Sequence, residues 1–166
     1  MTWYLVLDAY NVIGALDRYR EAESFDAARE LLVNDALKAA GWTGREVYVI
    51  FDAHRSPEPK RIEALAGGAV RVVYSASGES ADDVIERLLG DLDDPFTVYT
   101  ADFALQRTVL ARGGVRATPR EFADLLDELP AMTRRPGTPR RSRIADHLSA
   151  ETRLKLEEIR RRAGGY

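Results

Sequence analysis

Short apolar runs that end in polar residues recur along the chain and predict the strands of a sheet. They cover residues 3–7, 46–51, 69–75, 96–101 and 115–117. The first run, Trp3 to Leu7, is apolar at every position. A strand with two apolar faces is typical of the buried centre of a parallel sheet, so we expect this run to form a central strand.

Segments between these runs have the spacing and the start signals of amphipathic helices. The predicted helices are 25–40 with Ser24 as N-cap and Gly41 as its end, one that begins after Ser80, 102–112, and one from the capping box Thr118-Pro119-Arg120-Glu121 to Pro130. No clear helix signal follows Asp8, so we expect residues 9–23 to form a long polar loop. A short helix is expected near 58–66, ended by two glycines.

The alternation of strands and helices predicts an α/β domain with a mainly parallel sheet over residues 1–130. Residues 131–143 are rich in Pro, Gly and Arg without periodicity, which indicates a linker or extended arm. A last helix is predicted from Asp146 to Arg162. The division is therefore a 1–130 domain followed by a basic segment, 131–166.

Acidic residues follow several of the predicted strands. Asp8, Asp52 and Asp102 each come directly after an apolar run, and the loop after the third strand carries Glu79, Asp82 and Asp83. Because the carboxyl ends of parallel strands share one edge, these carboxylates are expected to converge there. Like charges held close require a counter-charge or proton uptake. Mg²⁺ or Mn²⁺, which prefer oxygen ligands, would supply that counter-charge.

Helix capping is the alternative role for an acid after a strand. Asp8 and Asp52 fit that role poorly because no clear helix is predicted immediately after them. Asp83 is adjacent to Asp82 and would point about 100° away on a helix, so we expect it to be a solvated partner of the helix dipole.

Composition narrows the class of protein. The 166 residues include no cysteine, which excludes disulfides, thiolate metal sites and cysteine nucleophiles. The first apolar run lacks a preceding basic region and is too short for a signal peptide or membrane span. We therefore expect a cytoplasmic protein without a membrane segment.

Charge is distributed unevenly. Residues 130–166 carry ten Arg or Lys against four Asp or Glu, a net charge of +6, whereas the whole chain has −3. The remaining residues therefore carry −9. A basic segment on an acidic body suggests a polyanionic partner such as a nucleic acid. The alternatives are that this segment docks on the acidic body or forms a solvated face.

Four ordered motifs carry a family resemblance. They are Asp8-Ala9-Tyr10-Asn11-Val12-Ile13, Val49-Ile50-Phe51-Asp52-Ala53-His54, Glu79-Ser80-Ala81-Asp82, and Thr100-Ala101-Asp102 with Gln106 four residues on. In this order they resemble the YacP-like NYN domains, relatives of PIN-domain nucleases, over residues 3–128. The resemblance implies a PIN-like three-layer α/β/α fold and a metal-dependent endoribonuclease. Since some family members are linked to translated mRNA, the ribosome is a candidate partner.

The resemblance also implies roles for individual residues. The acidic cluster corresponds to Asp8, Asp52, Asp82 and Asp102, of which Asp8, Asp82 and Asp102, together with Glu79, are the expected ligands of Mg²⁺ or Mn²⁺. Asn11 is expected to hold a carboxylate or a phosphate oxygen of RNA, and Gln106 to contact RNA or to buttress Asn11. Apart from the resemblance, Arg107 is a candidate for an RNA phosphate contact, with an ordinary surface arginine as the alternative. Two residues depart from the family pattern: Ala9 replaces a usual glycine, and Leu105 stands where an acid is frequent.

Three further residues have weaker support. His54 could act as a general base, although the sequence shows no partner for it and a structural role is the alternative. Arg55 and Arg71 are candidates for RNA phosphate contacts or ordinary surface arginines.

Two other functions remain open from the sequence. The first is an RNA- or ribosome-binding module of the same fold without catalysis. The second is a phospho-accepting receiver domain, which places acids after its first and third strands and a Thr after its fourth, here Asp8, Asp52 and Thr100. A receiver also requires a Lys after its fifth strand, where Arg116 is the nearest cation.

Overall fold

The computed structural model describes residues 3–52 and 60–130. Within them the chain forms a six-stranded sheet of order β3-β4-β2-β1-β5-β6, in which every pair of neighbours is parallel except the antiparallel pair β3–β4. The strands are β1 (Tyr4–Asp8), β2 (Glu46–Phe51), β3 (Arg61–Leu65), β4 (Val70–Tyr74), β5 (Phe96–Tyr99) and β6 (Val115–Ala117). The predicted, mainly parallel α/β sheet is confirmed.

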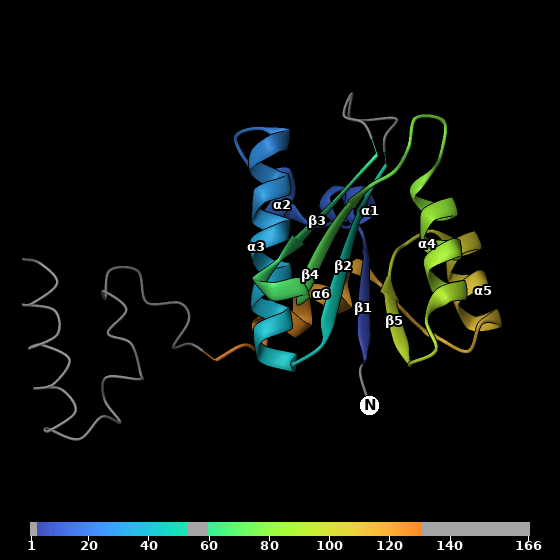
Figure 1. Ribbon diagram of the computed structural model, residues 1–166. Helices are drawn as coiled ribbons and strands as arrows, with labels where there is room; N and C mark the ends of the chain where they lie inside the picture. Colours follow the sequence, from blue (N-terminus) through green and yellow to red (C-terminus); the bar gives the residue numbers. More distant parts are fainter. Residues whose placement is uncertain (1–2, 53–59, 131–166) are drawn as a thin grey trace, which may run out of the picture. The chain divides into compact units, whose positions relative to one another are not determined.

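Helices cover both faces of this sheet. They are α1 (Ala9–Ala15), α2 (Asp17–Arg20), α3 (Phe25–Thr43), the short 3₁₀ helix η2 (Ala66–Gly68), α4 (Ala81–Asp91), α5 (Phe103–Ala111) and α6 (Pro119–Asp127). Figure 1 shows α3 on one side of the sheet and α4 and α5 on the other. Two separate apolar cores result, one under α1, α2, α3 and α6 and one under α4 and α5. This is the expected three-layer α/β/α arrangement.

Strand β1 lies in the middle of the sheet, between β2 and β5. Leu5 and Leu7 enter the core under α3, whereas Val6 enters the core under α4 and α5, and all three are fully buried. The apolar residues on both faces of β1 therefore serve two cores, as its sequence predicts.

The predicted N-caps form as expected. The Ser24 Oγ accepts a hydrogen bond from the Ala27 N–H at 3.0 Å, and Ser80 and Thr118 each begin a capping box. In the first of these boxes the Asp83 carboxylate accepts from the Ser80 N–H, so Asp83 caps α4 rather than only facing solvent.

Two predictions of local structure are wrong. Residues 9–23 are not one loop, because α1 and α2 lie within them and bury Val12, Ile13 and Tyr19. The helix expected near 58–66 is absent from its described part, where β3 pairs antiparallel with β4. Four of the five β3 residues are exposed, so this edge strand lacks the apolar alternation by which a strand is recognised.

The end of α3 also differs from the prediction. The helix continues through Gly41 to Thr43 and ends at Gly44, which adopts the left-handed conformation with φ 69°. Glycine occupies this conformation at little cost, which makes it the common residue at a helix end. The linker and last helix predicted for 131–166 lie outside the described residues.

The structure also bears on membrane insertion. Within residues 3–52 and 60–130, none of the helices combines the length and the apolar character that a membrane crossing requires.

Gly41 and Gly44, at the end of α3, give opposite predictions for the free energy of unfolding. Gly44→Ala forces a side chain into a left-handed conformation, and we expect the free energy of unfolding to fall by about 1 kcal/mol. Gly41→Ala, whose added Cβ meets nothing within 4 Å, should raise that energy by up to about 1 kcal/mol. Urea unfolding of both variants measures this difference, and the opposite order would place the helix end at Gly41.

Candidate active site at the carboxyl edge of the sheet

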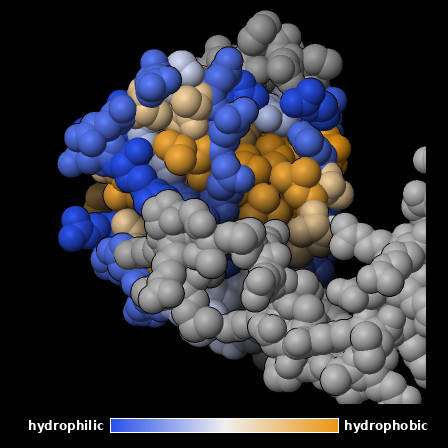
Figure 2. Space-filling view, turned by 90° about the vertical axis from the view of Figure 1, so that its left-hand side faces the viewer, coloured by the Kyte–Doolittle hydropathy of each residue, from blue (hydrophilic) through white to orange (hydrophobic). Residues whose placement is uncertain are grey.

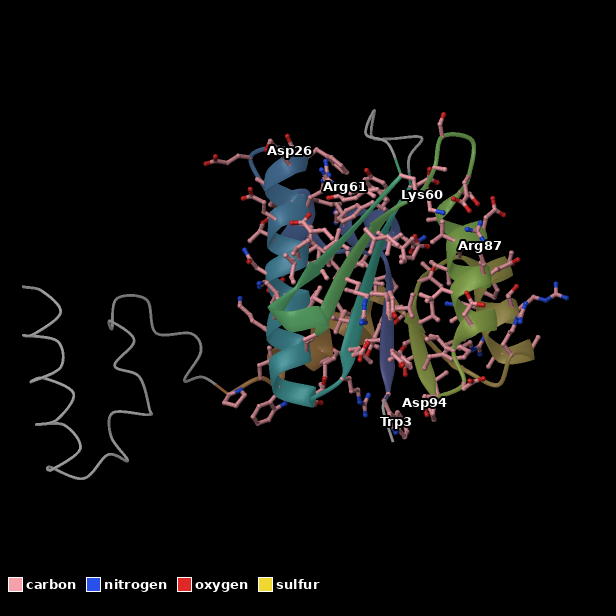
Figure 3. The ribbon with its side chains drawn as sticks, viewed as in Figure 1. Trp3, Asp26, Lys60, Arg61, Arg87 and Asp94 are labelled. Atoms are coloured by element: carbon pink, nitrogen blue, oxygen red, sulfur yellow. The ribbon has the colours of Figure 1, made fainter. Side chains whose placement is uncertain are left out.

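The strand order reverses at β1, and this opens a crevice at one edge of the sheet. Strands β2, β3 and β4 lie on one side of β1 in the sheet. The chain then returns, and β5 lies on the other side of β1. Connections that leave in opposite directions create a crevice beyond the carboxyl ends of the strands, where α/β proteins bind ligands. In Figure 3, Trp3 and Asp94 mark the edge where β1 and β5 begin, and Lys60 and Arg61 lie at the opposite edge.

A hollow of about 530 Å³ lies at this carboxyl edge. Three of the predicted acids, Asp8, Asp52 and Asp82, line it together with Asn11. Asp102 adjoins them, because its charge raises the pKa of both Asp8 and Asp82. Acids from β1, β2, α4 and the start of α5 are thus brought together from distant parts of the chain.

Asp8 is the most buried of these acids. It ends β1 and is 7% exposed. Burial raises its pKa to about 6, with further increases from the charges of the other acids, while a hydrogen bond from the Thr100 hydroxyl opposes the shift. Helix α1 begins directly after Asp8, yet its side chain makes no capping hydrogen bond. The carboxylate therefore faces its partners in the crevice rather than serving the helix.

Thr100 connects two of the acids, a role that its sequence context did not predict. Its fully buried Oγ1 donates to Asp8 Oδ2 at 2.9 Å and accepts from the Asp102 N–H at 3.0 Å. One hydroxyl thereby fixes the end of β1 to the start of α5. The Thr-Ala-Asp motif pointed to this position, but its spacing alone did not predict the two bonds.

Asn11 also fixes a loop of the site. Its Oδ1 accepts from the Ala101 N–H at 2.7 Å, which ties α1 to the loop after β5. The side chain lines the hollow while its oxygen is used by the protein. The structure therefore shows a positioning contact for Asn11, and its predicted RNA contact stays a prediction.

Asp102, Asp82 and Asp52 differ in their surroundings. Asp102 Oδ1 accepts from the Leu105 N–H at 2.9 Å, so this acid does cap α5. Asp82 is partly exposed, and burial, followed by the charge of Asp102, raises its pKa. Asp52 Oδ2 accepts from the Ala81 N–H at 3.4 Å, a long contact between β2 and the start of α4. Asp8 and Asp82 thus have pKa values shifted toward the neutral range.

Glu79 does not line the hollow. Its carboxylate pairs with Arg87 and accepts from the Ala76 N–H, while its carbonyl accepts from the Ser75 hydroxyl. These contacts stabilise the turn before α4. Glu79 was predicted as a metal ligand; its carboxylate is paired with Arg87 in this turn, and the metal contact stays a prediction.

Two further candidates for RNA contact are used inside the protein. Gln106 is 8% exposed, and its Nε2 donates to the Thr100 carbonyl at 2.7 Å. Its side chain therefore supports the loop after β5 from inside the protein rather than facing a ligand. Arg71 pairs with Glu46 and lies over the Tyr48 ring. Arg107 is exposed on α5, which leaves its predicted RNA contact open.

Other sequence expectations have simpler outcomes. Ala9 is the fully buried first residue of α1, so no turn exists there for a glycine to relax. Leu105 packs in the core under α4 and α5, where an acid would be buried without benefit. His54 and Arg55 lie outside the described residues.

The donor set suits a hard cation. The hollow presents carboxylate and amide oxygens, the ligands that Mg²⁺ and Mn²⁺ prefer, and mutual repulsion among the acids would be relieved by a cation. In the described part of the chain, no three Asp, Glu or His side chains stand close enough together to hold an ion. A Mg²⁺ ion that keeps several of its waters is compatible with this wider arrangement.

The raised pKa of Asp8 predicts how stability changes with pH. A carboxyl group whose pKa rises from 3.8 to about 6 on folding binds its proton more tightly in the folded state. The free energy of unfolding therefore falls as pH rises through this window, by about 3 kcal/mol at most. Without divalent metal, Asp8→Asn should be more stable than wild type at pH 7.5 and nearly equal at pH 4. Thermal unfolding in EDTA tests this, and a pH-independent difference would contradict it.

The Thr100 hydroxyl provides a second prediction. Thr100→Val removes the hydrogen bond that lowers the pKa of Asp8, so we expect a higher pKa of Asp8 than in wild type. Carbon-detected NMR titration of the aspartate carboxyl groups measures this value. Thr100→Ser keeps the hydroxyl and serves as the control. Equal titration of Asp8 in the valine variant and wild type would show that the bond is unimportant.

Comparison with known proteins bears on the family and the fold of the chain. The chain is 33% identical over 138 residues to a Bacillus subtilis protein described as "Uncharacterized protein YacP", a match that covers 79% of this chain and 77% of that one. The crystal structure of a mutant form of Rae1 (YacP) from B. subtilis superposes with a TM-score of 0.64 at 29% identity, covering 78% and 77% of the two chains.

A second crystal structure of Rae1 (YacP) from B. subtilis superposes with a TM-score of 0.65 at 24% identity over 96% of this chain and 89% of that one, which shows the shared fold. The sequence model of the YacP-like NYN domain matches residues 5–161. The carboxyl-edge acids therefore belong to a PIN-like fold generally found in nucleases, and the chain is a member of the YacP-like NYN domain family.

Proposed function

We propose that this protein is a metal-dependent endoribonuclease that hydrolyses RNA phosphodiester bonds at the carboxyl edge of its sheet. The observation that supports this most directly is the cluster of acids around one hollow, contributed by four separate segments of a chain from a nuclease-like family.

Asp8, Asp82 and Asp102 are the proposed holders of Mg²⁺ or Mn²⁺, with Asp52 completing the set. Glu79 is omitted because Arg87 already neutralises it. A divalent ion at such a site supplies a reactive water and neutralises charge on the phosphoryl oxygens. The protein contributes position: the Thr100 hydroxyl orients Asp8, and Asn11 fixes the loop that carries Asp102.

Protonation of the acids adds a requirement on pH. Asp8 with a pKa of about 6 is mostly ionised at neutral pH and mostly protonated at pH 5. Burial, followed by the charge of Asp102, also raises the pKa of Asp82, which must likewise be ionised to hold the metal. Cleavage and metal binding should therefore both weaken as pH falls through about 6.

RNA is the proposed substrate, and charge supports this choice. The 130–166 segment carries +6 and would attract a polyanion to an otherwise acidic body. Lys60 and Arg61 lie at the same edge of the sheet as the ends of β1 and β2 (Figure 3). Translated mRNA on the ribosome is the finer form of the proposal, and it comes from the family resemblance alone.

One observation favours a second candidate, an RNA-binding module without catalysis. Within the described ranges, the acids do not form a ready three-ligand cluster. Such a module would bind RNA equally well with and without divalent metal and would not depend on Asp8. The receiver alternative is not retained, since the chain belongs to the NYN family and the Thr100 hydroxyl is already bonded to Asp8.

Substitution of the acids tests the proposal. With Mn²⁺ or Mg²⁺ and an RNA substrate, Asp8→Asn and Asp102→Asn should each lower cleavage at least about 100-fold, since even outer partners of a metal contribute 10- to 100-fold. Asparagine remains a good N-cap, so Asp102→Asn should keep α5 intact. Gel-based cleavage assays with added EDTA as the metal-free arm measure the effect.

Asp83 offers a matched control. Asp83→Asn removes the same charge one residue from Asp82, and an asparagine oxygen can still accept from the Ser80 N–H. This variant should cleave at close to the wild-type rate. Wild-type rates in both Asp8→Asn and Asp102→Asn would refute the assignment of the site. RNA binding by wild type without cleavage under any metal would select the non-catalytic module.

A further inference from the structure

A second hollow adjoins the acidic one. It has a volume of about 360 Å³ and shares Tyr10 and Gly14 with the lining of the acidic hollow. Both shared residues belong to α1, which therefore forms the wall between the two. The second hollow contains no acid among its described lining residues, so its chemistry differs from that of its neighbour.

An aromatic stack forms one side of this second hollow. Phe25, the first residue of α3, stacks on Tyr10 with ring centroids 5.1 Å apart and an interplanar angle of 21°. Tyr10 in turn packs edge-on against the buried Phe51 at 5.4 Å. Phe25 is nevertheless 42% exposed. A rigidly supported ring with this much exposed surface is suited to stack against a planar ligand.

A cation stands beside the aromatic stack. Arg20 lines the hollow and pairs with Asp17, whose side chain is 73% exposed. An ion pair in water contributes little, so a phosphate can compete for the guanidinium. The lining thus combines an aromatic ring, on which a nucleobase can stack, with a cation that can bind a phosphate.

Gly14 lies on the wall that the two hollows share. A Cβ built on Gly14 meets no atom within 4 Å, so the space beside it is free. Helix α3 begins at the same edge of the sheet as the acids, as the position of Asp26 in Figure 3 shows. A strand lying in the acidic hollow can therefore continue past Gly14 to Phe25.

We propose that the second hollow is a base-stacking subsite for single-stranded RNA. One nucleobase stacks on Phe25, the adjoining phosphate contacts Arg20, and the chain continues past Gly14 to the scissile phosphodiester among the acids. Unstacked bases of single strands bind aromatic side chains in this way. The volume, at the low end of small-ligand sites, admits one nucleoside and excludes a duplex. This inference rests on the proposed ribonuclease function.

A third hollow, larger than these two, does not suit the same strand. It has a volume of about 620 Å³, lies between α3, β3 and β4, and shares no lining residue with the acidic hollow. Figure 2 shows the α3 side of the molecule, where apolar surface is bordered by polar residues. Asp26, Glu30 and Glu63 line this hollow, and its Arg29 already bonds to the Tyr74 hydroxyl. Three carboxylates would repel an RNA backbone there.

Two substitutions test the subsite in the full-length protein. Phe25→Leu keeps an apolar side chain but removes the ring, and Gly14→Leu adds a side chain at the wall between the two hollows, where a Cβ meets no atom within 4 Å. Each should raise KM for an unstructured RNA oligonucleotide about tenfold, the order of one lost base–aromatic stack, and Phe25→Leu, which lies outside the acidic hollow, should leave kcat within about twofold. KM should change alone because the contact is equally present in the ground state and the transition state.

The chain offers a control for each variant. Trp42→Leu removes an exposed aromatic from the far end of α3, about 25 Å from Phe25 by helix rise, and should leave KM unchanged. Gly14→Ala adds only a methyl group to open space and should also bind as wild type does. Thermal unfolding of each variant confirms that the fold is retained.

Oligonucleotides with a single abasic position give a readout that a purely structural role would not change. For wild type, one abasic position near the cleaved bond should weaken binding about tenfold, and Phe25→Leu should be insensitive to that same position. Wild-type KM and unchanged abasic sensitivity in both Phe25→Leu and Gly14→Leu would overturn the subsite while the nuclease proposal stands. A wild-type protein that neither binds nor cleaves RNA would overturn both.

Discussion

The buried carboxylate of Asp8 is the constraint around which the crevice is built. An ionised acid that is 7% exposed is unfavourable unless polar groups or a cation compensate it. Among the described residues, Thr100 alone gives this carboxylate a direct hydrogen bond, and three more acids nearby raise rather than lower its pKa. The fold thus keeps four carboxylates close although their repulsion opposes this. A site that binds a cation accounts for this arrangement more simply than a structural role does.

The predictable parts of the fold are those whose sequence signals are local and strong. Strand β1 is apolar on both faces, and Ser24, Ser80 and Thr118 each mark a helix start through a hydrogen bond within three residues. Helix α1 and strand β3 lack such signals. Helix α1 is held by burial of Val12 and Ile13 against the sheet, and β3 by its pairing with β4, and both are tertiary effects. Gly41 and Gly44 show the same limit, since either could end a helix.

The site also has a part that the sequence could predict and a part that it could not. Asp8, Asp52, Asp82 and Asp102 could be placed at one edge because strand ends in a parallel sheet meet there regardless of side-chain detail. What each side chain bonds to depends on distances of a few ångströms, which spacing does not encode. For this reason Glu79, Gln106 and Asn11 are found in contacts with Arg87, the Thr100 carbonyl and the Ala101 N–H. Thr100, two residues before Asp102, bonds to both Asp8 and the Asp102 N–H and so holds these two acids together.

Helix α1 links the chemistry of the two hollows. Tyr10 and Gly14 are four residues apart and therefore lie on one face of the helix, while Asn11 is turned by about 100° toward the loop after β5. Through Asn11 this short helix positions the loop before Asp102, and through Tyr10 it supports the Phe25 ring. At Gly14 it carries no side chain between the two hollows. Any shift of α1 would change the acids and the aromatic stack together. Ala9 and Val12, both fully buried, fix this helix between the two hollows.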